Sequence, residues 1–83
     1  MNTRVVQRIQ TGVRLEKSLL KVLKALAEYC DLTLGDLLEG IVLHAFEGKP
    51  PFSDDTLTAI RGLKKVYQCE LRAADSHRLR EAG

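Results

Sequence analysis

The stretch from residue 8 to residue 15, RIQTGVRL, alternates in hydrophobicity with a period of two residues. Its odd positions are mostly apolar, and its even positions are cationic, polar or glycine. Because side chains alternate between the two faces of a β-strand, this pattern predicts a short strand with one apolar and one cationic face. A lone strand leaves its backbone donors and acceptors unpaired unless a second copy supplies a partner strand. The stretch therefore predicts a homodimer.

Two helical patterns follow the expected strand. In residues 17–30 and 34–47, apolar side chains recur at intervals of three and four residues, which is typical of an amphipathic α-helix. Thr33 precedes the second pattern, where its hydroxyl can accept a hydrogen bond from the amide of Gly35 or Asp36. A glycine and two prolines then end this helix.

A third helical pattern covers residues 54–74, after the proline-containing connection, and Ser53 can cap it. We expect this helix to cover the core, with a basic exposed side. The chain then divides into residues 1–48, with the strand and two helices, and residues 49–83, with the connection and the third helix. The predicted fold class is mainly α with one short β-strand.

Length and charge distribution add to this picture. An 83-residue chain makes one domain that buries only about 60% of its unfolded surface, so association that enlarges the core is expected. Residues 1–24 contain six bases and one acid, residues 25–59 one base and seven acids, and residues 60–83 six bases and three acids. A basic segment that coincides with the expected strand indicates a nucleic-acid surface. An ordinary solvated cationic surface is the alternative.

Several classes of protein are not indicated. The N-terminal residues lack the apolar core of a signal peptide, and no run approaches membrane-spanning length, so we expect a cytoplasmic protein. Cys30 and Cys69 are far apart in the sequence and the two histidines are not clustered, so neither a disulfide nor a metal site is expected. No nucleophile with its base and no phosphate-binding loop is present, and we expect neither an enzyme nor a cofactor.

The order of strand, helix, capped tight turn and helix in TGVRLEKSLLKVLKALAEYCDLTLGDLLEGIVLHAF resembles the ribbon-helix-helix DNA-binding proteins of the MetJ/Arc type. The resemblance covers about half of the chain. It implies a homodimer in which two strands pair antiparallel and the resulting β-ribbon enters the major groove of DNA. The predicted fold is therefore a ribbon-helix-helix homodimer with an added C-terminal helix.

The resemblance also assigns roles to residues. The base-contacting positions fall at Gln10, Gly12 and Arg14. Arginine can bind guanine and glutamine can bind adenine through paired hydrogen bonds. The expected phosphate contacts are Arg8, Lys17, Thr33, Leu34 and Gly35. The free amides at the start of the second helix suit an anion.

These assignments predict a homodimeric transcriptional regulator, typically a repressor, that binds double-stranded DNA sequence-specifically. Two alternatives stay open. In an antitoxin, the same dimer would bind DNA while the helix at 54–74 binds a toxin. In a dimeric protein-interaction module, DNA binding would have been lost. Gly12, which offers no side chain, and the negative charges of Asp31 and Asp36 favour that second alternative.

Overall fold

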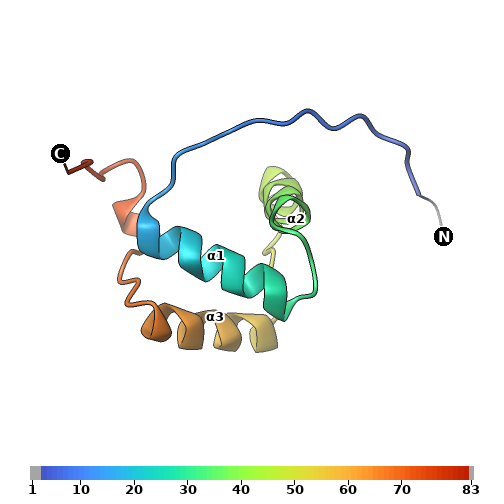
Figure 1. The fold of residues 1–83 in the computed structure, drawn as a ribbon. Coiled ribbons are helices and arrows are strands. Elements are labelled where there is room, and N and C mark those ends of the chain that lie inside the picture. Colours follow the sequence, from blue (N-terminus) through green and yellow to red (C-terminus); the bar gives the residue numbers. More distant parts are fainter. Residues whose placement is uncertain (1–2, 83) are drawn as a thin grey trace.

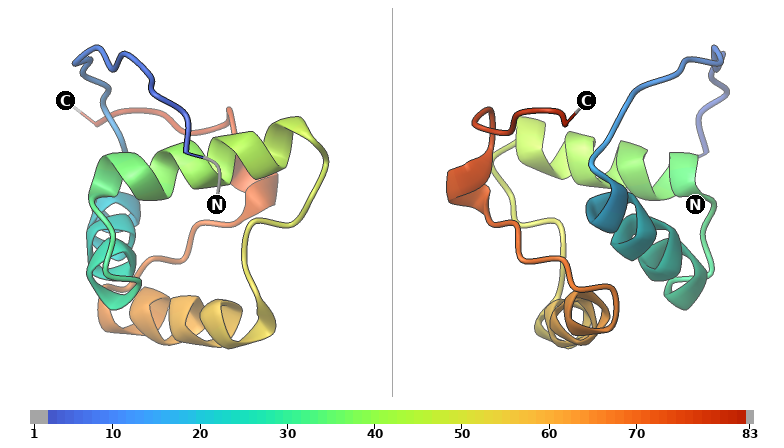
Figure 2. Two further views of the ribbon diagram at one scale, coloured as in Figure 1. Left: turned by 90° about the vertical axis from the view of Figure 1, so that its right-hand side faces the viewer. Right: turned by 60° about the vertical axis from the view of Figure 1, so that its left-hand side comes forward.

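The structure, a computed structural model, describes residues 3–82. It contains three α-helices of 13 residues each, α1 (Lys17–Tyr29), α2 (Leu34–Phe46) and α3 (Asp54–Val66), and a short 3-10 helix, Ala73–Asp75. α1 and α3 lie side by side, and α2 packs across α1 (Figure 1). The N-terminal segment passes over α2 on the side away from α3, as two further views show (Figure 2).

Each of the three α-helices begins at a side chain that accepts a hydrogen bond from a backbone amide of the first turn. The hydroxyls of Thr33 and Ser53 accept from the amides three residues further on, at 3.1 and 3.3 Å. Both caps were predicted from the sequence, and both are confirmed. The carboxylate of Glu16 caps α1 in the same way, at 2.9 Å from the amide of Leu19. These caps satisfy amides that have no partner inside the helix.

The three α-helices also end alike. The residues that reverse the chain have positive φ angles, which are 58° at Asp31, 70° at Gly48 and 55° at Gln68. In each turn, the amide of the following residue donates to the carbonyl five residues back, at 2.8 to 2.9 Å, as in a Schellman motif. The turn at Gln68 ends α3 at Val66, so the predicted helix over 54–74 was too long.

The core lies between α1, α2 and α3. Its buried side chains are Val22, Leu26, Ala27, Leu37 and Cys69. Ile60 and Leu63 of α3 pack against this core, so α3 covers it as expected. Cys69 reaches the core because the chain reverses direction after α3, and both cysteines have free thiols.

The predicted β-strand at residues 8–15 is wrong. No residue between positions 3 and 82 is in a strand, and residues 3–15 take no part in backbone–backbone hydrogen bonds. The segment is extended, as its alternation predicts, but an extended backbone becomes a strand only when a neighbour pairs with its amides and carbonyls. Here it is solvated, so the described chain is all α, and the β-ribbon and the ribbon-helix-helix fold are not observed.

Candidate nucleic-acid interface

All but one of the residues predicted to contact DNA lie on two elements, and the exception, Lys17, is the first residue of α1. The first element is the extended segment of residues 3–16, which we call the arm, and every one of its residues is exposed. The arm contains Arg4, Arg8 and Arg14 and no acid before Glu16. An extended, exposed and cationic segment has the charge and the reach to follow a nucleic-acid backbone.

The second element is the start of α2. The amide of Asp36 donates to Thr33 Oγ1, and the amide of Leu37 donates to the Thr33 carbonyl oxygen at 3.0 Å. Within residues 3–82, the amides of Leu34 and Gly35 have no hydrogen-bond partner, as is usual for the first turn of a helix. Free amides at the positive end of a helix dipole suit a phosphate.

An open hollow of about 860 Å³ lies between the arm and the first half of α2. It brings together six of the eight residues predicted to contact DNA, namely Arg8, Gln10, Gly12, Thr33, Leu34 and Gly35. Arg14 and Lys17 are not among its lining residues. A Cβ atom at Gly12 would meet no atom within 4 Å, so packing within the chain does not require glycine there.

Carboxylates of α2 hold Arg8 at the edge of this hollow. Arg8 Nε and Nη2 donate to the two carboxylate oxygens of Glu39, at 3.0 and 2.9 Å, and Asp36 lies 3.8 Å from Nη2. The paired hydrogen bonds raise the pKa of Arg8 and lower the pKa of Glu39, with the charge of the partner as a further cause. All three side chains are about half exposed or more, so water and salt weaken this ion pair.

Arg14 points to a different partner. Its Nη2 atom donates to Glu81 Oε1 in the C-terminal segment, and both side chains are largely exposed. The structure therefore places a carboxylate on each of two arm arginines. Sequence reasoning identified Arg8 and Arg14 but missed Glu39 and Glu81, which lie 31 and 67 residues from their partners. The spacing of Asp36 and Glu39, one helical turn apart on one face of α2, was the available signal for the first pair.

Comparison with protein-family models, with curated proteins and with solved structures finds no significant match for this chain. Across residues 3–82, no cluster of three or more histidine, cysteine or acidic side chains is arranged to hold a metal ion. None of the helices in this range is long and apolar enough to span a bilayer.

Proposed function

We propose that this chain binds double-stranded DNA as a homodimer and regulates transcription in the cytoplasm. The supporting observation is the hollow between the arm and the start of α2, which is lined by Arg8 and Gln10 of the arm and by Leu34 and Gly35, whose amides are free. In this proposal the arm lies in a groove of the duplex, where extended cationic arms bind. The amides at the start of α2 hold the adjacent phosphate.

Binding by the arm involves an exchange of ion pairs. The guanidinium of Arg8 leaves Glu39 and Asp36 and contacts a phosphate, and Arg14 likewise leaves Glu81. The exchange is feasible because exposed ion pairs are weak, whereas phosphate contacts also release counterions from the DNA. Gln10 has no charge to lose and can bind adenine by paired hydrogen bonds.

The homodimer part of the proposal is supported by apolar side chains that the chain leaves exposed. Among residues 3–82 only five hydrophobic residues are buried, whereas the arm and α2 expose several large ones. They are Val5, Val6, Ile9, Val13, Leu15, Val42, Leu43 and Phe46. A helix that is apolar on most of its faces is usually buried on most of them, and α2 buries only Leu37. A second copy that covers this surface would enlarge the core of a small domain.

A mobility-shift assay tests the DNA part. We expect the full chain to bind genomic duplex fragments at low salt, and more weakly at higher salt, because phosphate contacts release counterions. Arg14→Ala should cost about 1 to 3 kcal/mol and reduce sequence preference if Arg14 contacts guanine, or weaken all duplexes alike if it contacts a phosphate. Lys21→Ala removes an exposed charge of α1 that does not line the hollow, and it serves as the matched control. Equal affinity of both variants and the unmodified chain for every duplex would contradict the proposal.

Sedimentation equilibrium tests the dimer. We expect a dimer at micromolar concentration and a shift toward monomer for Phe46→Ser. Phe46 is 82% exposed in the single chain, so its replacement should not disturb the fold of the monomer. Tyr29→Ser, which alters another exposed aromatic side chain at the end of α1, is the control. A folded monomer at this concentration would exclude the dimer.

A second candidate function is a dimeric protein-interaction module without DNA binding. The observation that favours it is the pairing of Arg8 with two carboxylates of α2, since a stable ion pair would hold the arm against α2 as part of the fold. The antitoxin alternative draws less support, because Ile60 and Leu63 of α3 pack against the core of the chain itself.

A further inference from the structure

A second concave site lies between α1, α3 and the segment that follows α3. It is a pocket of about 220 Å³, and its walls are almost entirely apolar side chains from α1, α3 and the connections around them, together with Ile41 of α2. Leu23, Phe52, Ile60 and Leu71 line it and are only partly buried, so the pocket is open to solution. The arm contributes no residue to it, and the pocket is therefore distinct from the candidate nucleic-acid interface.

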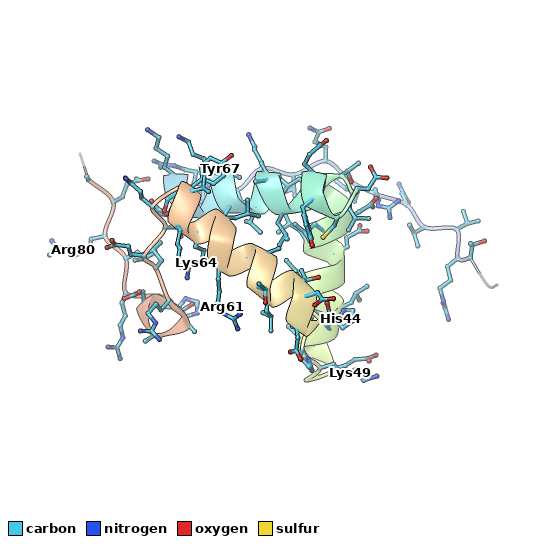
Figure 3. The ribbon with its side chains drawn as sticks, turned by 90° about the horizontal axis from the view of Figure 1, so that it is seen from below. His44, Lys49, Arg61, Lys64, Tyr67 and Arg80 are labelled. Atoms are coloured by element: carbon cyan, nitrogen blue, oxygen red, sulfur yellow. The ribbon has the colours of Figure 1, made fainter. Side chains whose placement is uncertain are left out.

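Lys64 is the only charged side chain among the described residues that line this pocket. It lies on the side of α3 that faces the C-terminal segment (Figure 3). Its ammonium donates to the Leu71 carbonyl oxygen at 2.7 Å and is partly buried. None of the ion pairs between residues 3 and 82 includes Lys64, so no carboxylate of the described chain neutralises it. An ammonium has three donors, and two of them remain for a ligand.

We propose that this pocket binds a small carboxylic acid whose apolar chain or ring fills the cavity and whose carboxylate contacts Lys64. The apolar walls provide burial for the hydrocarbon part, and the single unneutralised cation gives the charge preference. The pocket is smaller than the roughly 300 to 1,000 Å³ that is usual for drug-sized ligands. At about 30 Å³ for each non-hydrogen atom the pocket accommodates roughly seven, which is enough for the five alkyl carbons of hexanoate or the six ring carbons of benzoate, with the carboxylate outside the cavity at Lys64. This site goes beyond the proposed function and does not depend on it.

Lys64 also has a structural role, because its bond to the Leu71 carbonyl holds the chain after α3. The test must therefore separate ligand binding from this structural effect. Hexan-1-ol provides the separation, since it has the same chain as hexanoate without the carboxylate. Lys65 provides a second control, since it is adjacent in sequence and basic but does not line the pocket.

The experiment is a titration of the full chain followed by NMR of its methyl groups. We expect hexanoate and benzoate to shift the methyl resonances of Leu23, Ile60 and Leu71 saturably. Hexanoate should bind at least about tenfold more tightly than hexan-1-ol, because a hydrogen bond between charged groups is made only by the acid. Lys64→Met should bring the affinity for hexanoate down to that for hexan-1-ol, whereas Lys65→Met should leave it unchanged.

Three outcomes would overturn the proposal. Absence of saturable shifts would show that the pocket binds neither hexanoate nor benzoate. Equal affinity for hexanoate and hexan-1-ol on the unmodified chain would show that no carboxylate site exists, and this comparison needs no variant that might fail to fold. Hexanoate binding that is the same in Lys64→Met and the unmodified chain would show that another group holds the carboxylate.

Discussion

Replacement of Glu39 by glutamine should increase the affinity of the chain for duplex DNA. Glu39 accepts two hydrogen bonds from the guanidinium of Arg8, at 2.9 and 3.0 Å, and its charge lies at the edge of the hollow where a phosphate is proposed to bind. Glutamine keeps the shape of the side chain and removes the negative charge. Arg8 then exchanges to a phosphate without leaving an ion pair, and the repulsion between Glu39 and that phosphate disappears.

The size of the effect follows from the exposure of the pair. The side chains of Arg8 and Glu39 are 64% and 48% exposed, so the gain should be at the scale of exposed ion pairs, up to about fivefold in affinity at low salt. Arg8 contacts a phosphate in both complexes, but Glu39 offsets its charge only in the unmodified one, so the slope of the logarithm of affinity against the logarithm of salt concentration should steepen by up to about 0.9. The gain should therefore shrink as salt rises.

Fluorescence anisotropy with a labelled duplex at several salt concentrations measures both quantities. Glu28→Gln is the matched control, because it removes one exposed acid of α1 that forms no ion pair within the described residues. In the double variant Arg8→Gln with Glu39→Gln, the extra gain should be lost, since the exchanged guanidinium is absent. Affinity and salt slope that match the Glu28→Gln control would refute the exchange of Arg8 from Glu39 to DNA.

Three further predictions concern the helix ends. Thr33→Ala should lower the free energy of unfolding by about 1 kcal/mol, which denaturant titration measures. Thr33→Asp should keep this stability but weaken DNA binding, which fluorescence anisotropy measures. If Thr33→Asp binds DNA fully at low salt, the start of α2 is not the phosphate site. Gln68→Gly should raise stability by up to about 1 kcal/mol, because glycine adopts a φ of 55° without strain, and a lower melting temperature would contradict this. Hydrogen bonds from the Ser18 hydroxyl and the Leu19 amide lower the pKa of Glu16 below its ordinary value. Its contribution to stability is therefore full above the ordinary pKa and is lost as pH falls through the lower folded pKa. Melting curves of the unmodified chain and Glu16→Gln should therefore differ near neutral pH and converge in acid, and a constant difference would oppose this account.

The helix starts could be predicted because their signals are local. Thr33 and Ser53 each stand three residues before an amide of the first turn, and this spacing alone allows the hydroxyl to act as a cap. The end of α2 was equally visible, since Gly48 adopts its positive φ without a steric penalty. The end of α3 was not, because glutamine occupies the position with positive φ. Gln68 is held in that conformation by the turn and by the burial of Cys69, whose exposed fraction is 5%.

The strand was mispredicted because a strand requires both an extended backbone and a paired neighbour, and the alternation of residues indicates only the first. Alternating apolar and polar residues favour an extended backbone, and residues 3–16 form a stretched segment outside any helix or strand (Figure 1). Pairing is a second requirement that depends on a neighbour, and the sequence of the arm does not contain that information. The arm therefore keeps its alternation while its backbone is solvated.

The candidate interface was likewise predictable where it depends on local sequence and not where it depends on distant contacts. The positive charge of the arm and the free amides of α2 could be predicted from residues close together in the sequence. Both elements line one hollow because the short turn at Asp31 brings α2 back toward the arm. The pairing of Arg8 with Glu39 and of Arg14 with Glu81 depends on contacts between distant segments, which the sequence leaves open. These ion pairs decide whether the arm is fixed to its own chain or free to bind DNA. A guanidinium can pair with a carboxylate of the same chain or with a phosphate, and it forms whichever contact is more stable.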